Sequence, residues 1–379
     1  MKEGTARQTH DAATPRSSLI LLNPGPVNVS ERVRRALTGP DLCHREPEAA
    51  ELLASVRGRL GAAFAPGGGY DVAVLSGSGT LAVEAAVTSA VSPGKRLLVI
   101  NNGVYGQRMV DMARAHGIPV VQVRTAWRQR PSLGAVEAAL QRDRQIEVIA
   151  LVHHETTVGL LNPVVEIGAI AKRFGRTLVV DAVSGLAGDE LDLDACGVAL
   201  CVGTAGKCIQ AFPGVAFVLV RKAETRRMRA LAPRSVYLHL PNYLTAAPPP
   251  IPFTPALQLL AAFDEALAEL LEETVAGRIQ RYRAAALRLR AGFSALNLRI
   301  LVPEAWRSNS LTTLALPPSV SYAALHDGLK ERGFVIYEGQ GRLKAQIFRV
   351  ANMGALSNEV LDGALAALGE VLRRKRKHA

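Results

Sequence analysis

Short apolar runs alternate with amphipathic segments through the middle of the chain, between residues 71 and 221. The apolar runs are rich in β-branched residues and end in small or polar residues, as buried parallel strands do where they open into loops. Between them, apolar residues recur with the period of 3.6 that indicates a helix. The expected strands cover residues 71–75, 96–100, 120–123, 146–152, 177–180, 198–202 and 214–221. The expected helices cover residues 81–91, 109–116, 134–142 and 166–174.

This alternation predicts the fold class. Strands that alternate with helices form βαβ units, whose right-handed crossovers place helices on both faces of a parallel sheet. We therefore expect an α/β protein built on one doubly wound, mostly parallel sheet. The carboxyl ends of the strands of such a sheet form the edge at which ligands bind.

The N-terminal flank has a different pattern. A short apolar strand is expected at 18–22, followed by the turn Asn23-Pro24-Gly25-Pro26, whose two prolines exclude a helix. Ser30 then suits the first position of a capped helix, and residues 51–64 have helical periodicity.

A proline-rich stretch separates the sheet region from the rest of the chain. Residues 246–252 predict a linker or an extended crossing. A long helix with one apolar stripe opens at Thr254-Pro255, and Gly277 interrupts it. Beyond it, strands are expected at 311–316, 334–337 and 346–350, and helices at 321–332 and 357–374. We thus divide the chain into an N-terminal arm (1–22), a large domain (23–277) and a smaller C-terminal α+β domain (278–379).

The composition is that of a globular protein, with 49% hydrophobic and 21% charged residues. No apolar run approaches the roughly 20 residues that span a bilayer, and the polar stretch 1–16 has no signal-peptide core. The four cysteines form neither a C-x-x-C pair nor a metal-ligand spacing. We therefore expect a cytoplasmic protein with reduced thiols, no metal and no membrane partner.

The formal net charge of +12 raises the question of a nucleic-acid partner. Much of this charge lies in the basic run 373–377, at the end of an amphipathic helix, where cations suit the helix dipole and are usually solvated. Aromatic residues make up only 5% of the chain, and no segment matches a nucleic-acid module. We expect no nucleic-acid binding, and the positive charge fits an anionic small substrate equally well.

An acid and an amine follow two of the expected strands. Asp181 ends the run that begins at Thr177, and Lys207 lies in the segment Val202-Gly203-Thr204-Ala205-Gly206-Lys207. At the ligand-binding edge, this pair suits pyridoxal phosphate (PLP). The amine can bond to the cofactor aldehyde, and the carboxylate can keep the pyridine nitrogen protonated. An ordinary buried ion pair, or a lysine that faces solvent, is the alternative interpretation.

A glycine-rich turn, Ser76-Gly77-Ser78-Gly79-Thr80, lies between an expected strand and an alanine-rich helix. Free N–H groups at a helix N-terminus bind phosphate. Gly77, Gly79 and Ala82 also satisfy the dinucleotide pattern G-x-G-x-x-A, but residues 97–102 lack the acid that would hold a ribose. The turn therefore predicts a site for one phosphate rather than for a pyrophosphate.

Other residues at expected strand ends are open to two interpretations. Tyr105 lies in a glycine-rich loop and is either a loop anchor or a plate that stacks on a flat ring. His153 and His154 are adjacent, so they point to opposite faces of a strand and are poorly placed to chelate one metal ion. We expect the hydroxyl of Thr156 or Thr157 to be the polar contact of this segment.

With these pieces placed, the sequence resembles the fold-type I, class V aminotransferases, a group that includes alanine–glyoxylate, serine–pyruvate and 2-aminoethylphosphonate–pyruvate transaminases. The likeness runs from about Ile20 to about Gly354 and rests on seven motifs in the family's order. They are Asn23-Pro24-Gly25-Pro26, Ser76-Gly77-Ser78-Gly79-Thr80, Asn102-Gly103-Val104-Tyr105-Gly106-Gln107-Arg108, His154-Glu155-Thr156-Thr157, Asp181-Ala182-Val183-Ser184, the lysine segment and Phe348-Arg349-Val350. The separation of 26 residues between Asp181 and Lys207 also fits the family.

The resemblance implies a role for each matching residue. Lys207 would bond covalently to PLP, Asp181 would pair with its pyridine nitrogen, and Tyr105 would stack on its ring. Ser78, Gly79 and Thr80 would hold the phosphate, and Thr156 would reach the ring hydroxyl. Arg349 would grip a substrate carboxylate, with Gly25 beside the substrate. Thr254 would reach the cofactor phosphate of a neighbouring subunit, which implies a homodimer.

Within the group, four segments resemble the 2-aminoethylphosphonate–pyruvate transaminases most. They are Cys43-His44-Arg45-Glu46, Lys207-Cys208-Ile209-Gln210, Arg234-Ser235 and Phe334-Val335-Ile336-Tyr337. This likeness implies 2-aminoethylphosphonate as amine donor and pyruvate as 2-oxo acid acceptor, with His44 or Arg45 as a second cation for the phosphonate. The sequence departs from the pattern at Gly206, where asparagine is usual, and over 237–250. A serine–pyruvate or alanine–glyoxylate aminotransferase, or a related PLP enzyme acting on another amino acid or phosphonate amine, is the alternative.

Overall fold

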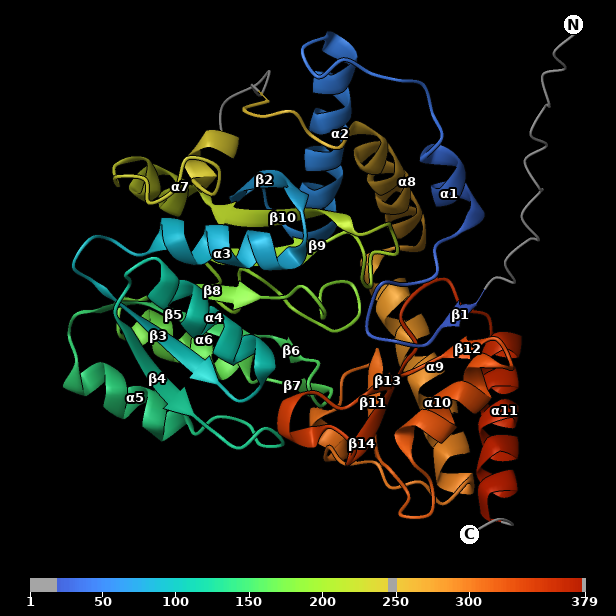
Figure 1. Cartoon of the computed structure of the whole chain (residues 1–379). Coiled ribbons are helices and arrows are strands. Elements are labelled where there is room, and N and C mark those ends of the chain that lie inside the picture. The colour runs from blue at the N-terminus through green and yellow to red at the C-terminus, as the bar shows by residue number, and fades with distance from the viewer. Residues whose placement is uncertain (1–18, 245–250, 377–379) are drawn as a thin grey trace, which may run out of the picture.

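The computed structural model describes residues 19–244 and 251–376, and its centre is a seven-stranded sheet (Figure 1). The strand order is β2-β10-β9-β8-β5-β3-β4. The strands are β2 (Tyr70–Gly77), β3 (Arg96–Asn101), β4 (Val120–Arg124), β5 (Ile146–Val152), β8 (Thr177–Asp181), β9 (Leu200–Thr204) and β10 (Gly214–Arg221). Of these seven strands, only β10 runs in the direction opposite to the other six. The expected mostly parallel sheet is confirmed.

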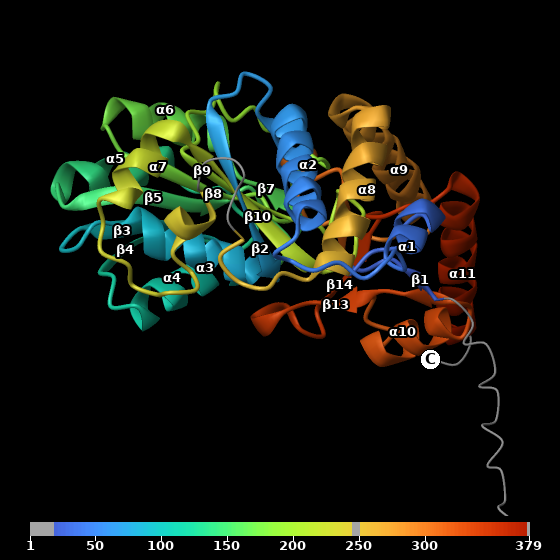
Figure 2. The ribbon, with the colours of Figure 1, turned by 90° about the horizontal axis from the view of Figure 1, so that it is seen from above.

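Helices cover both faces of this sheet, as Figure 2 shows from above. One face carries α3 (Gly79–Ala90), α4 (Val104–Ala115) and α7 (Lys222–Arg229), and the other carries α2 (Pro47–Phe64), α5 (Leu133–Arg142), α6 (Val164–Arg173) and α8 (Leu257–Glu273). Successive strand residues enter the two cores in turn, since Leu178 and Val180 pack on one side and Val179 on the other. The sheet is therefore doubly wound, as the pattern predicts.

A third core lies in the C-terminal part of the chain and includes Phe293, Phe348 and Val350. A three-stranded sheet of β11 (Leu311–Ala315), β14 (Ile347–Ala351) and β13 (Tyr337–Glu338) packs with α9 (Val275–Ala295), α10 (Tyr322–Lys330) and α11 (Asn358–Arg376). The N-terminal strand β1 (Ile20–Leu21) pairs in parallel with β12 (Phe334–Val335), so the first described strand joins the last part of the chain.

Shorter elements connect these layers. They are α1 (Glu31–Ala36), β6 (His154–Glu155), β7 (Leu160–Leu161) and the 3-10 helices η1 (Leu240–Tyr243), η2 (Glu304–Trp306) and η3 (Gly341–Leu343). Ser30 caps α1 as expected, because its hydroxyl accepts a hydrogen bond from the N–H of Val33 at 3.1 Å.

Three expected boundaries were wrong. Tyr105 lies in the first turn of α4 rather than in a loop, because Gly106 lets the helix start directly against the end of β3. The single strand expected at 334–337 is two strands, β12 and β13, which belong to different sheets. The long helix breaks at Thr274, which has a φ of 67°, and Gly277 lies inside the first turn of α9, where its N–H bonds to the Thr274 hydroxyl.

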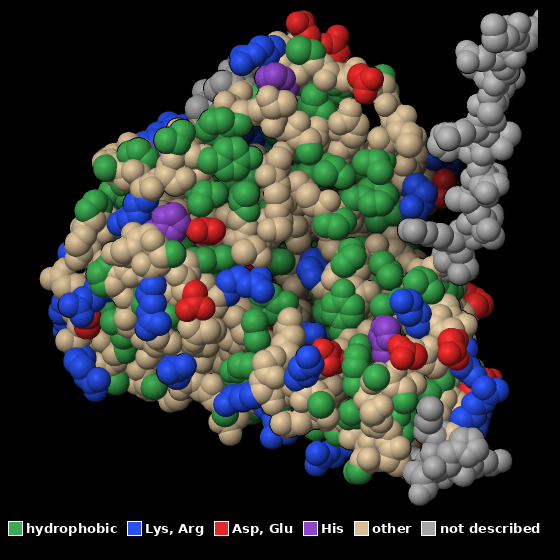
Figure 3. Space-filling model, in the orientation of Figure 1, with side chains coloured by type: hydrophobic (Ala, Val, Ile, Leu, Met, Phe, Trp, Pro, Cys, Tyr) green, Lys and Arg blue, Asp and Glu red, His purple; other side chains and the backbone are tan. Residues whose placement is uncertain are grey.

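Several expectations concern residues outside the described ranges. They are most of the N-terminal arm (1–18), most of the proline-rich stretch (245–250) and the end of the basic run. On the face shown in Figure 3, Lys and Arg side chains are spread widely rather than gathered in one stripe. Within residues 19–244 and 251–376, no helix combines the length and the apolar character needed to cross a membrane.

A buried polar cluster joins α9 to the turn that follows β9. The side-chain amide of Gln210 donates to the Tyr282 hydroxyl at 2.7 Å and to the carbonyl of Gly354 at 2.7 Å. The N–H of Gly354 donates to the same hydroxyl at 3.0 Å, and Arg278 donates to the carbonyl of Cys208 at 3.1 Å. Gln210 has a φ of 70°, so these bonds hold a residue in a conformation that L-residues rarely adopt.

Removing the hydroxyl at the centre of this cluster should destabilise the protein. In Tyr282→Phe, the buried N–H of Gly354 loses its hydrogen-bond acceptor, and the Gln210 amide loses one of its two, so the free energy of unfolding should fall by about 1–3 kcal/mol. Tyr322→Phe is the matched control, because it loses one bond, to the carbonyl of Ile336, from a half-buried position. Urea unfolding of both variants is the measurement. An equal or larger loss in Tyr322→Phe would contradict the role of the cluster.

Candidate active site

A cavity of about 260 Å³ opens where the carboxyl ends of the central strands meet. Its walls come from the ends of β5, β8, β9 and β10, from the first turns of α3 and α4, and from the turn that holds Gly25. Seven residues singled out from the sequence line it: Gly25, Ser78, Gly79, Thr80, Tyr105, Asp181 and Lys207. The remaining lining residues include Arg108, His154, Val183, Ser184 and Thr204.

Lys207 reaches this cavity from the turn after β9. Its Nζ donates to the carbonyl of Pro24, and a Cβ at Gly25 would overlap that amine. Gly25 also has a φ of 95°, which a side chain disfavours, so glycine is required here on two grounds. Burial, more than any neighbouring charge, lowers the pKa of Lys207 to about 8. The amine therefore loses its proton far more readily than an exposed lysine.

Asp181 ends β8 and is buried in the cavity floor. One carboxylate oxygen, Oδ1, accepts a hydrogen bond from the N–H of Val183 at 3.0 Å, and no described residue donates a hydrogen bond to the other oxygen. Burial raises the pKa of Asp181 to about 6, although that hydrogen bond and the charges of Arg108 and Lys207 oppose the shift. The carboxyl is thus ionised at neutral pH and can meet a positively charged ring nitrogen.

The N-terminus of α3 forms another wall. Ser78 is the N-cap in an extended conformation and makes no side-chain capping bond, and the first N–H groups of a helix have no partner within the helix. A Cβ at Gly79 would meet the side chain of Val183 at 2.8 Å, so the glycine permits the close approach of the helix to the floor. These donors and the helix dipole fit one phosphate group.

Arg108 adds a cation to this wall, and sequence reasoning gave it no role. Its Nη1 donates to the Thr80 hydroxyl at 2.9 Å, and its guanidinium lies 4.7 Å from the centre of the Tyr105 ring. Tyr105 and Arg108 are three residues apart in α4 and therefore share a face. The expected start of that helix at residue 109 concealed this spacing.

Thr156 and Arg349 contact each other, and neither is part of the cavity lining. The hydroxyl of Thr157 is already bonded to Glu155 and to the N–H of Val104, whereas the buried Thr156 Oγ1 has no hydrogen-bond partner in the described part of the chain. Arg349 Nη1 donates to the backbone carbonyl of Thr156 at 2.9 Å. Of the two threonines, Thr156 therefore has the free hydroxyl.

Arg349 itself is buried and is held by two further contacts, from β13 and the segment that follows it. Its Nε donates to the carbonyl of Glu338 at 3.0 Å, and its Nη1 lies 3.3 Å from Oε1 of Gln340. Burial lowers its pKa below the usual range. The contact with Gln340 is the weakest of the three and the only one made to a side chain, so an incoming anion can replace it.

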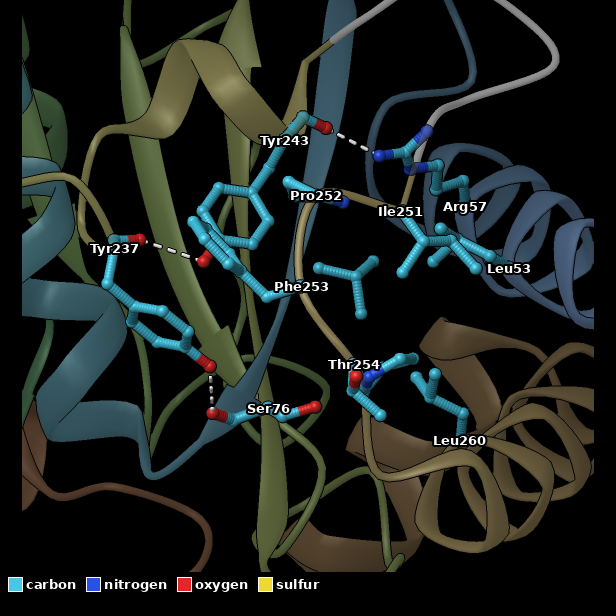
Figure 4. Close-up of a pocket in the computed structure, with 12 residues that line it drawn as sticks. Leu53, Arg57, Ser76, Tyr237, Tyr243, Ile251, Pro252, Phe253, Thr254 and Leu260 are labelled. Carbon is cyan, nitrogen blue, oxygen red and sulfur yellow. Dashed lines mark hydrogen bonds between the residues drawn. The ribbon is translucent and has the colours of Figure 1, made fainter. Parts of the chain in front are cut away.

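Thr254, His44 and Arg45 lie apart from the Lys207 cavity within one chain. Thr254 lines a separate pocket with Tyr237 and other residues (Figure 4), and its Oγ1 is 3.5 Å from Nε2 of His44. Arg45 is exposed in the turn before α2. Within this chain, therefore, the structure does not bring these three residues to the cofactor cavity.

The residues of the cavity fit PLP. A carboxylate, an amine and a helix N-terminus with an adjacent arginine match its pyridine nitrogen, its aldehyde and its phosphate. The unpartnered Thr156 hydroxyl matches its ring hydroxyl in chemistry, although Thr156 is not part of the cavity lining. His153 and His154 do not share a metal site, because His154 lines this cavity and His153 lines a different crevice.

Comparison with known proteins agrees with this assignment. The family described as aminotransferase class-V matches residues 36–351. A curated protein from Klebsiella pneumoniae named 2-aminoethylphosphonate–pyruvate transaminase is 35% identical, with 93% of this chain and 97% of that protein covered. A protein of the same name from Syntrophobacter fumaroxidans is 36% identical, with 95% and 98% covered.

Solved structures of aminotransferases resemble the fold closely. The subgroup IV aspartate aminotransferase of Thermus thermophilus has a TM-score of 0.86 at 30% identity and covers 94% of this chain and 99% of its own. The alanine–glyoxylate aminotransferase of Nostoc sp. has a TM-score of 0.89 at 27% identity and covers 98% and 100%. Given a family match over most of its length, this chain belongs to the class V aminotransferases, which are PLP-dependent enzymes.

Proposed function

We propose that this enzyme transfers the amino group of 2-aminoethylphosphonate to pyruvate, giving phosphonoacetaldehyde and L-alanine. The observation that carries the proposal is the similarity to proteins named for that activity, which extends over more than nine tenths of this chain at 35–36% identity. The solved aminotransferases named for other substrates are 27–30% identical in the examples given above.

The chain's own groups divide the chemistry between them. Bound PLP supplies an aldehyde carbon that holds the substrate nitrogen and a ring that draws electrons from the neighbouring carbon. We assign Lys207 Nζ as the base that takes the proton from the substrate carbon, because its lowered pKa of about 8 leaves it readily deprotonated. We assign Asp181 to hold the ring nitrogen in its protonated form.

Arg349 is the group that we assign to the substrate anion. Its planar fork can take the carboxylate of pyruvate or alanine, and the same fork can take a phosphonate. A phosphonate head is dianionic and benefits from a second cation. We assign this role to Arg45 or His44, contributed by a second subunit.

The proposed assembly is a homodimer. The pocket that holds Thr254 is lined by Tyr237, which exposes 36% of its surface, and the preceding Val236 exposes 76%, so two apolar side chains are available to a partner. All four cysteines are unpaired thiols, which suits the reducing cytoplasm that we propose as the compartment. Sedimentation should give twice the chain mass of 40.4 kDa, and an active species of single mass would contradict the dimer.

Asp181→Asn should weaken cofactor binding in a pH-dependent way. An amide cannot hold a positive ring nitrogen, and a charge-assisted bond of about 1.5–3 kcal/mol corresponds to roughly a tenfold to hundredfold change in affinity at pH 8. The pKa of Asp181 is raised to about 6, so the wild-type carboxylate exists above that pH and is lost below it. The difference in PLP affinity between the wild-type and variant apoproteins, measured by fluorescence titration, should shrink from pH 8 to pH 5. A difference in PLP affinity that stays constant from pH 8 to pH 5 would refute the assignment of Asp181.

Donor preference tests the proposed function directly. In half-reactions followed by the colour change of the cofactor, 2-aminoethylphosphonate should react faster than serine or alanine. Arg349→Ala should slow both the phosphonate and the alanine half-reactions roughly a hundredfold, and Arg349→Lys should recover part of that loss because it keeps the charge without the fork. Arg45→Ala should weaken the phosphonate half-reaction more than the alanine half-reaction. If serine or alanine reacts faster in the wild-type enzyme, the alternative substrate assignment holds.

A further inference from the structure

His154 is a buried residue of the cofactor cavity to which neither the sequence analysis nor the proposed function gives a role. It begins β6, its side chain has no exposed surface, and it lines the cavity together with Lys207 and Asp181. Its Nε2 is buried without a hydrogen-bond partner among the residues that the structure describes. Because His154 lines the cofactor cavity, a bound ligand can supply the hydrogen-bond partner that a buried polar atom needs.

The surroundings of the other ring nitrogen fix the tautomer of His154. Nδ1 lies 3.2 Å from the carbonyl oxygen of Ser184, which can only accept a hydrogen bond, so Nδ1 carries the proton. The Ser310 hydroxyl is farther away, at 3.5 Å, and Oδ2 of Asp189 is at 4.0 Å. In this tautomer Nε2 has a lone pair and acts as an acceptor.

The imidazole is neutral in this environment. Burial lowers the pKa of His154 to about 3, and the hydrogen bond to Ser184 opposes that shift only in part. The charged or titratable neighbours that lower the pKa further are His153, Lys207 and Arg290. The neighbouring acid is Asp189, whose own pKa burial raises to about 7.

A second unsatisfied atom lies two residues along the chain. The buried Oγ1 of Thr156 also has no partner within the described ranges. Thr156 is the first residue of the turn that follows β6, so it directly follows the strand that carries His154. One atom is a hydroxyl that can donate and the other is a nitrogen that can accept, so together they match a ligand hydroxyl, which both accepts and donates.

We propose that His154 Nε2 accepts a hydrogen bond from the ring hydroxyl of bound PLP, while the Thr156 hydroxyl donates to the same oxygen. This inference rests on the proposed cofactor chemistry and adds to it a positioning residue that holds a proton on the ring. The carbonyl of Ser184 orients the imidazole through Nδ1, and the Asp189 carboxyl lies 4.0 Å from the same nitrogen.

His154→Asn isolates the proposed bond, because asparagine keeps an N–H near the position of Nδ1 but has no acceptor at Nε2. In this variant the PLP affinity of the apoprotein, measured by fluorescence titration, should fall roughly tenfold. The pH at the midpoint of the bound cofactor's absorbance titration should fall by about one unit. The reason is that His154 Nε2, as the acceptor, stabilises the protonated form of the ring hydroxyl, and the variant lacks this acceptor. His153→Asn is the matched control, because His153 is also buried but lies outside this cavity, and it should change neither quantity.

An unchanged affinity and an unchanged midpoint in a folded His154→Asn protein would overturn the inference. If that variant does not fold, histidine ¹⁵N spectra of the wild-type protein decide: the unprotonated Nε2 signal should move when PLP is added to the apoprotein, and a fixed signal would overturn the inference. A wild-type apoprotein that binds no PLP would instead overturn the proposed function.

Discussion

The position of the Lys207 amine depends on buried hydrogen bonds that fix the turn after β9, to which Lys207 belongs. Tyr282 joins Gln210 to Gly354, and Arg278 donates to the carbonyl of Cys208, next to Lys207. An unmet buried polar group costs more than a typical hydrogen bond contributes, so such a cluster favours one arrangement. Because Tyr282 and Gly354 lie in the C-terminal part of the chain, the packing of that part against the sheet and the position of the amine are determined together.

The layout of the sheet and the chemistry at its edge could be predicted because both are local properties of the sequence. Asp181, Lys207 and the turn Ser78 to Thr80 each follow an apolar β-branched run, and parallel topology alone brings such positions to one edge. The structure places all of them around one cavity, with Tyr105. The fold class followed from the same alternation of strands and helices.

The residues that sequence reasoning missed depend on contacts between distant segments. Arg108 was hidden because Gly103 and Gly106 suggested a loop, whereas Gly106 is the residue that lets α4 pack on the end of β3. The acceptor role of His154 Nε2 can be assigned only from the structure, because it depends on the carbonyl of Ser184, thirty residues away in the sequence. Arg349 was identified by family resemblance alone. Its contact with Thr156 spans 193 residues of sequence, so no local pattern predicts it.

The claim at the centre of this account is that the amine of Lys207 holds the cofactor in the cavity between Asp181 and the N-terminus of α3. Sodium borohydride fixes PLP covalently to the lysine that carries it, and peptide mass mapping then identifies that lysine. The account predicts the label on Lys207, with none in a Lys207→Ala protein that still folds. A label on another lysine, or no label on a protein purified with PLP, would contradict it.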